Sequence, residues 1–199
     1  MPDTLQIADC FAEGSLAYVG ANLVAMGSFH LRDRGRFARL LRAHGLLRGW
    51  SMRLARTGVA LAELGTGLAA TAALLLGWGS PTVVGCIVFV AGAVACAFLL
   101  YVRGLIARGV EGDCGCYFID AARSDRPGYG PAGALLAAAL VGVGAVSSGG
   151  GVEGFSGALA LRRFVVLMLG TTAVILVQML GRLWGASDAT VVRVPPSRG

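Results

Sequence analysis

The chain has 199 residues, of which 56% are hydrophobic and only 14% are charged, and its mean hydropathy is +0.72. A soluble domain carries roughly a quarter of its residues as charged side chains, so this composition excludes a water-exposed globule and indicates a protein surrounded by lipid. The net charge is +6, and the chain contains arginine but no lysine. The arginines stand mainly beside hydrophobic runs, as the positive-inside rule requires, and this placement argues against nucleic acid as a partner.

Five hydrophobic runs follow one another along the chain. A helix needs roughly 20 apolar residues to cross the hydrocarbon core, with about 17 as the lower limit. The N-terminal residues carry Asp3 and Asp9 and no basic residue, so they lack the positive region of a secretory signal, and the first run is expected to remain as a span. The fold class we predict is therefore all-α, a polytopic transmembrane helical bundle with about five spans. The runs cover residues 11–31, 57–78, 82–102, 131–147 and 164–183.

The segment between the first two runs, residues 32–56, alternates apolar and basic residues at helical spacing. Phe37, Leu41 and Trp50 are among its apolar positions and Arg39 is one of its basic positions. This pattern predicts an amphipathic helix that lies in the membrane interface, with a break at Gly45.

The remaining connections are short or polar. Residues 77–81 form a tight turn with an interfacial tryptophan, and residues 147–157 are rich in glycine and serine, which predicts a flexible loop. Residues 1–186 are expected to form a single integral membrane domain, and residues 187–199 a disordered tail. Within the spans, the glycine pairs Gly20/Gly27 and Gly58/Gly65 are interpreted as helix-packing faces.

The distribution of arginine predicts the orientation of the bundle. The loops after the first and third runs are rich in arginine, whereas the turn between the second and third runs has none. The positive-inside rule then places the N-terminus outside and these two loops in the cytoplasm. Arg162 and Arg163, at the start of the fifth run, fall on the opposite side from the one that this rule predicts.

The loop after the third run contains the sequence Asp113-Cys114-Gly115-Cys116. A disulfide between Cys114 and Cys116 would close a very small ring, and such strained disulfides are relatively oxidising and labile. Asp113 would raise the thiol pKa, whereas arginines such as Arg103 would favour the thiolate. Two other interpretations stay open: a structural pair of cysteines, or a two-coordinate Cu(I) site. No further cysteine or histidine pair completes a zinc site, and the sequence indicates no cofactor.

Glu63 lies about two turns inside the second run. An ionisable group at that depth costs several kcal/mol unless it is paired or hydrated, so it is a candidate functional residue. Arg103 and His30 are its two candidate partners. Because successive spans alternate in direction, His30, Glu63, Arg103 and the Cys114/Cys116 loop are all expected on one membrane face. The alternative is an ion pair that only holds two helices together.

The ordered set of these features resembles the MauE methylamine-utilisation proteins, which are similar to the DoxX-like membrane proteins. The features are residues 27–33 at the end of the first span, Glu63 in the second, Arg103 at the end of the third, and residues 113–117. His30 stands where the family usually has lysine, so the chain resembles a divergent member.

The resemblance implies a four-helix core plus one further span, in the cytoplasmic (inner) membrane of a bacterium. It also implies that Cys114 and Cys116 are a redox pair, that Glu63 is the intramembrane acid, and that the partner is a thioredoxin-like protein or a dehydrogenase subunit. The function we predict is a membrane thiol–disulfide redox component that oxidises, reduces or relays electrons to a partner protein. Its role would be in the maturation of a disulfide-containing protein of the methylamine-dehydrogenase type. The alternatives are a non-enzymatic assembly factor with structural cysteines and a copper-handling protein.

Overall fold

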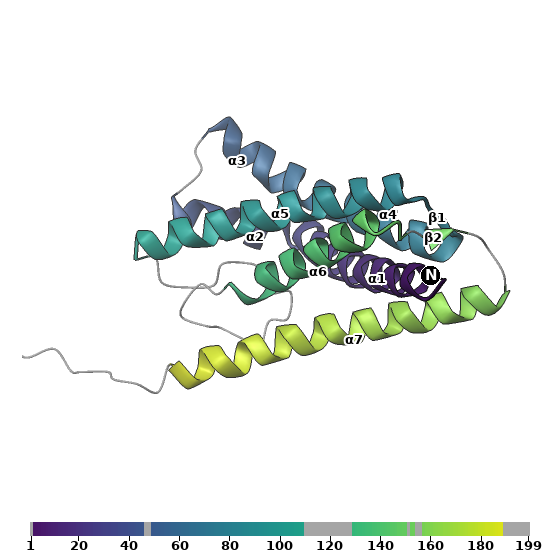
Figure 1. Cartoon of the computed structure of the whole chain (residues 1–199). Helices are drawn as coiled ribbons and strands as arrows, with labels where there is room; N and C mark the ends of the chain where they lie inside the picture. Colours follow the sequence, from purple (N-terminus) through teal and green to yellow (C-terminus); the bar gives the residue numbers. More distant parts are fainter. Residues whose placement is uncertain (1, 46–48, 110–128, 151, 154–156, 189–199) are drawn as a thin grey trace, which may run out of the picture.

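The computed structural model describes residues 2–45, 49–109, 129–150, 152–153 and 157–188. These residues form a bundle of long helices with a short helix across one end (Figure 1). The elements, in chain order, are α1 (Pro2–Arg32), α2 (Arg34–His44), α3 (Trp50–Leu54), the π-helix η1 (Ala55–Val59), α4 (Ala60–Leu76), β1 (Trp78–Gly79), α5 (Pro81–Ala107), α6 (Gly130–Ser147), β2 (Val152–Glu153) and α7 (Gly157–Asp188). The all-helical class is confirmed, apart from one two-residue bridge. The tail predicted for residues 187–199 lies outside the described residues beyond Asp188.

Helix α1 is the centre of the bundle, because it packs against α4, α6 and α7. Apolar residues on α1, such as Leu16 and Leu23, are fully buried and belong to one core with Leu74 of α4 and Val88 of α5. Neighbours on several sides leave α1 with little surface for lipid. It can therefore carry buried polar side chains that would be costly on a lipid-facing helix. These are Glu13, Ser15, Asn22 and His30.

Close packing between α1 and α4 depends on glycine. A Cβ atom at Gly27 of α1 would lie 2.7 Å from the backbone nitrogen of Leu64, and one at Gly67 of α4 would lie 2.6 Å from that of Val24. Small residues allow membrane helices to approach at such distances. The predicted packing role of Gly20 and Gly27 agrees with this contact. The prediction for Gly65 is wrong, because an added Cβ there has no heavy atom within 4 Å.

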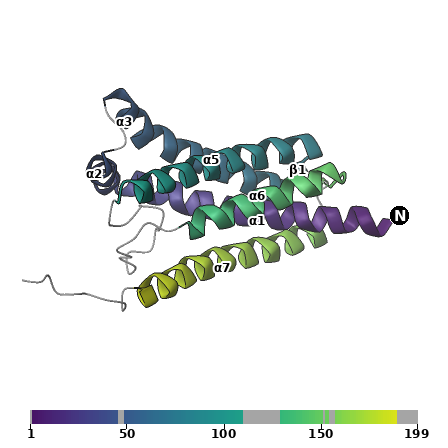
Figure 2. The same cartoon turned by 60° about the vertical axis from the view of Figure 1, so that its left-hand side comes forward.

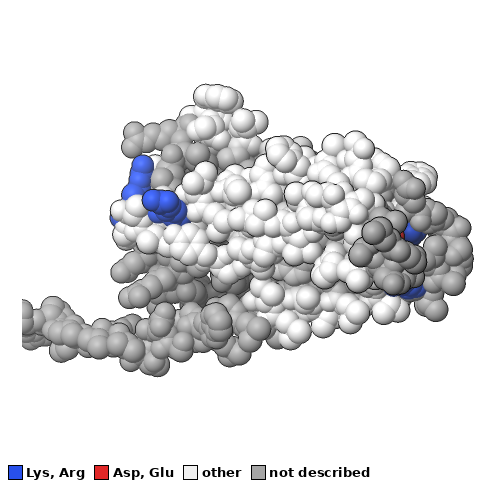
Figure 3. All heavy atoms as spheres, in the orientation of Figure 1, with Lys and Arg blue, Asp and Glu red and all other residues white. Residues whose placement is uncertain are grey.

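The outer surface between the two ends of the bundle is apolar. Large side chains such as Phe89 and Leu100 of α5 are exposed. On the face seen in Figure 3, the flank between the two ends is white, and the blue and red side chains lie near the ends. Three helices of the described residues are long and apolar enough to span a membrane: Trp50–Leu76, Pro81–Ala107 and Gly130–Ser147. The five-span count stays a prediction.

Helix α2 lies across one end of the bundle. Figure 2 views it nearly along its axis, whereas the long helices run across the page. Its apolar face, with Phe37, Ala38 and Leu41, is buried against the bundle. The helix ends at His44, and Gly45 has a φ of 64°. The break predicted at Gly45 is therefore confirmed. The second half of the predicted interfacial segment instead joins α4, through α3 and η1, in one continuous helical stretch, Trp50–Leu76.

The loop predicted to be flexible, residues 147–157, contains an ordered pair. Val152 and Glu153 form an antiparallel bridge with Gly79 and Trp78 of β1. Val152 is 1% exposed and belongs to the hydrophobic core. The flexible-loop prediction is wrong at these two residues, because one apolar side chain in a Gly/Ser-rich sequence is buried at the end of the bundle opposite α2.

Candidate functional site

The candidate site lies at the end of the bundle that α2 crosses, which we call the α2 rim. The last turn of α1, the first turns of α4, the end of α5 and the start of α6 meet at this rim (Figure 1). The alternation of helix direction predicted that these ends would be together. His30 is in the last turn of α1, and Glu63 is one turn inside α4.

His30 and Glu63 form a buried pair. Nδ1 of His30 lies 2.7 Å from Oε2 of Glu63, and the two side chains are 1% and 0% exposed. Of the two partners that the sequence suggests for Glu63, the structure thus places His30 in contact. A contact between an acid and an imidazole in a water-excluded site can hold a proton on either group.

Phe37 of α2 covers this pair from the rim. Its ring stacks on the imidazole of His30, with ring centroids 4.1 Å apart and an angle of 22° between the planes. The contact explains why α2 packs across the bundle end instead of leaving it. The apolar periodicity of residues 32–56 predicted that Phe37 would face inward, but it gave no sign of which residue it would meet.

One oxygen of the Glu63 carboxyl has a different environment from the other. Oε1 is buried and has no hydrogen-bond partner among the described residues, whereas Oε2 meets His30. A buried oxygen without a partner is costly, and such groups often mark a bound proton, a water molecule or a functional contact. Glu63 is therefore equipped to carry a proton on Oε1 while Oε2 stays with His30.

The π-helix η1, residues Ala55–Val59, directly precedes the turn that carries Glu63. Single turns of π-helix are rare and frequently occur at functional sites. The composition of this stretch gave no signal for it, because π-helical turns have no distinct sequence pattern.

Arg103 is exposed on α5 at the α2 rim, so it is not a member of the buried pair. Asp113, Cys114 and Cys116 lie outside the described residues. The described residues that flank them, Gly109 and Tyr129, follow α5 and precede α6.

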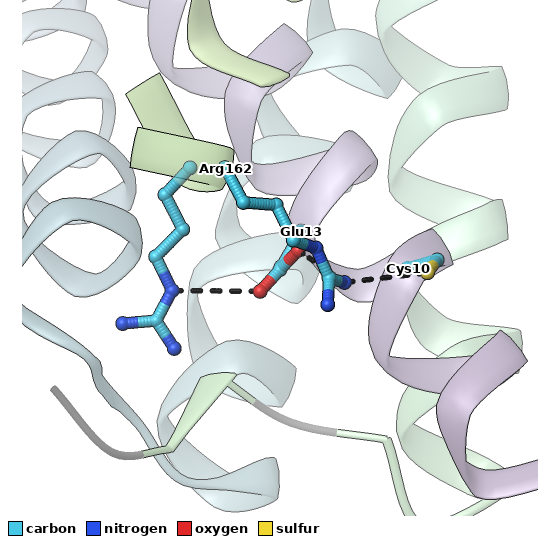
Figure 4. Close-up of polar contacts among 4 residues, drawn as sticks. Cys10, Glu13 and Arg162 are labelled. Atoms are coloured by element: carbon cyan, nitrogen blue, oxygen red, sulfur yellow. Dashed lines mark hydrogen bonds and ion pairs between the residues drawn. The ribbon is translucent and has the colours of Figure 1, made fainter. Parts of the chain in front are cut away.

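A second polar cluster at the opposite end of the bundle was not predicted. Glu13 of α1 forms ion pairs with Arg162 and Arg163 of α7, with shortest N–O distances of 2.7 and 3.4 Å (Figure 4). Arg162 Nη2 also donates to Sγ of Cys10, 3.3 Å away. Arg163 is 1% exposed. These contacts explain the two arginines that contradict the positive-inside pattern, because both pair with a buried acid.

Within the described part of the chain, no group of three or more histidine, cysteine or acidic residues is arranged to hold a metal ion. The two-coordinate Cu(I) alternative concerns Cys114 and Cys116, which are outside it.

Comparison of the chain with models of protein families, with curated proteins and with solved structures finds no match. The assignment of a function therefore depends on the residues and on their geometry.

Proposed function

We propose that this chain is a membrane thiol–disulfide component with a MauE- or DoxX-like role, in which Cys114 and Cys116 exchange a disulfide with a partner protein. The observation that carries the proposal is the buried His30–Glu63 pair, because it sets a proton-holding carboxyl at the α2 rim. The partner would be a thioredoxin-like protein or a dehydrogenase subunit that contains disulfides.

The proposal includes five spans in a bacterial inner membrane. Helices α1 and α7 have 31 and 32 residues, which corresponds to roughly 45 Å of helix and exceeds the hydrocarbon thickness. Four polar residues lower the hydropathy of α1 without facing lipid, because their side chains are buried in the bundle: Glu13, Ser15, Asn22 and His30. With five spans and an arginine-rich α2 rim, the N-terminus is outside and the Cys114/Cys116 loop is cytoplasmic.

The length of the connecting chain limits the distance between Cys114 and the α2 rim. Cys114 follows Gly109 by five positions, and an extended chain covers at most about 3.6 Å per residue, or roughly 18 Å in all. This distance is shorter than the bilayer core is thick. The dithiol therefore belongs to the same side of the membrane as the end of α5.

The reaction is an exchange that needs no external oxidant. A thiolate of a partner dithiol attacks the Cys114–Cys116 disulfide, which releases one of the two cysteines and leaves the other in a mixed disulfide with the partner. The partner's second thiolate then attacks the partner's own sulfur in this mixed disulfide and releases the second cysteine. The partner loses two electrons and two protons, and Cys114 and Cys116 gain them. The Glu63 carboxyl is suited to hold one of these protons at the rim.

The test is to trap thiols in membranes with and without a reductant, and to measure function in the double variant Cys114→Ser/Cys116→Ser. We expect reductant-dependent labelling in the parent and complete loss of function in the variant. The matched control is Cys86→Ser/Cys96→Ser, because these two cysteines are free and exposed on α5. Thiols that stay reduced and unreactive under all conditions would contradict the proposal.

The second candidate function is an assembly factor that binds its partner without redox chemistry. Trp50 favours it, because this side chain is 77% exposed at the start of α3. This function requires that the double serine variant stays active while Trp50→Ala is inactive. The same pair of variants therefore separates the two functions.

A further inference from the structure

We propose that the α2 rim is a binding surface for the headgroups of anionic phospholipids. The inference does not depend on the proposed redox function. It rests on the charge of this rim, on the way α2 is held, and on an exposed tryptophan beside it.

The described residues of the α2 rim are strongly basic. Six exposed arginines come from the end of α1, from α2 and from the end of α5, and the one exposed acidic residue described with them is Asp33. Figure 3 shows arginine side chains gathered at this end, next to the apolar flank. The six are Arg32, Arg34, Arg39, Arg42, Arg103 and Arg108.

The fold holds these arginines beside the ends of long apolar helices, which is where lipid headgroups meet a membrane bundle. The apolar face of α2 is buried, with Phe37 stacked on His30, so the basic face of α2 is directed away from the bundle. The guanidinium group binds phosphate oxygens through two parallel hydrogen bonds. Arginine clusters immediately beside membrane spans attract anionic lipids for this reason.

Trp50 supplies the apolar half of such a surface. It is 77% exposed, Leu54 one turn later is 59% exposed, and α3 contacts α2. Tryptophan concentrates at the level of the headgroups, where its ring lies among acyl chains and its N–H meets water. An acidic soluble protein would complement the charge of the arginines but would not account for the exposed side chains of Trp50 and Leu54 beside them. An anionic lipid has both a charged headgroup and apolar chains, so it accounts for both features.

The opposite end of the bundle provides an internal comparison. Trp78 is 71% exposed there, almost as much as Trp50. The arginines described near that end, Arg162 and Arg163, are both paired with Glu13. The two ends thus present similarly exposed tryptophans but very different numbers of exposed arginines among the described residues.

The experiment compares two single-tryptophan proteins in vesicles of equal parts phosphatidylcholine and phosphatidylglycerol. One protein keeps Trp50 (Trp78→Phe/Trp184→Phe) and the other keeps Trp78 (Trp50→Phe/Trp184→Phe). Bromine on the acyl chains of one lipid at a time quenches the fluorescence of any tryptophan next to that lipid. We expect brominated phosphatidylglycerol to quench Trp50 about twice as strongly as brominated phosphatidylcholine does, and Trp78 about equally with both.

Two further measurements identify the cause of the difference. The triple variant Arg34→Gln/Arg39→Gln/Arg42→Gln is expected to lower the quenching ratio of Trp50 to about 1, and so is about 0.5 M NaCl in the parent, because salt screens charges at this distance. The salt measurement needs no substitution and stays informative if the variant misfolds. Equal ratios for Trp50 and Trp78, or a Trp50 ratio that is insensitive to salt, would overturn the proposal.

Discussion

His30→Leu is expected to lower the free energy of unfolding by about 3 kcal/mol or more. The substitution removes the group that lies 2.7 Å from Oε2 of Glu63 and leaves a fully buried carboxyl whose other oxygen also has no partner among the described residues. Breaking a buried pair by removing one member costs about 3–5 kcal/mol. Titration of the purified protein in mixed micelles with a denaturing detergent measures the change.

The double variant His30→Leu/Glu63→Leu serves as the control for this prediction. An apolar pair of similar volume leaves no buried polar group without a partner, and such replacements are often neutral or stabilising. We therefore expect the double variant to recover most of the lost stability while it loses the proposed thiol-exchange function. A single variant as stable as the parent would show that Glu63 does not need His30.

Gly67→Leu is expected to prevent normal assembly of α1 with α4. A Cβ atom at this position would lie 2.6 Å from the backbone nitrogen of Val24 and 2.9 Å from its Cγ2. Backbone cannot move aside as a side chain can, so the two helices would have to separate. Overpacking typically costs about 1–3 kcal/mol and occasionally more, and the backbone contact places this case at the upper end. The yield of folded protein and its stability to detergent measure the effect.

Gly65→Leu is the matched control, because it adds the same side chain to the same helix two residues away. Gly65 is exposed and an added Cβ meets no heavy atom within 4 Å. Leucine also forms helix more readily than glycine does. We expect this variant to be as stable as the parent or more stable. Equal damage from both substitutions would contradict the close α1–α4 contact.

The meeting of His30 with Glu63 is the part of the site that the sequence predicted best. If the first two runs cross the membrane in opposite directions, the end of the first run lies beside the start of the second. Burial depth then marked Glu63 as a residue in need of a partner. The choice between His30 and Arg103 required coordinates, because both stand near the same rim and only the rotation of each helix decides which side chain faces inward.

Other features had no local signal in the sequence. Val152 is one apolar residue in a glycine- and serine-rich loop, and only the three-dimensional packing shows that it is buried. Glu13 meets Arg162 and Arg163 from about 150 residues away in the chain, so no spacing rule relates them. The available hint was that Arg162 and Arg163 lie on the side of the membrane that the positive-inside rule does not predict. The charge of an arginine that is paired with a buried acid is compensated, so such an arginine says little about membrane orientation.

The central claim is that the Cys114/Cys116 dithiol and the His30–Glu63 pair share one side of the membrane. Labelling by a membrane-impermeant maleimide, in sealed vesicles of both orientations, tests it directly. Three single-cysteine proteins are compared: one with Cys114 only, one with Cys10 only, and an otherwise cysteine-free protein with Arg34→Cys at the exposed α2 rim. We expect Cys114 and the residue 34 probe to react from the same side, and Cys10 from the opposite side. Labelling of Cys114 from the side of Cys10 would contradict the account.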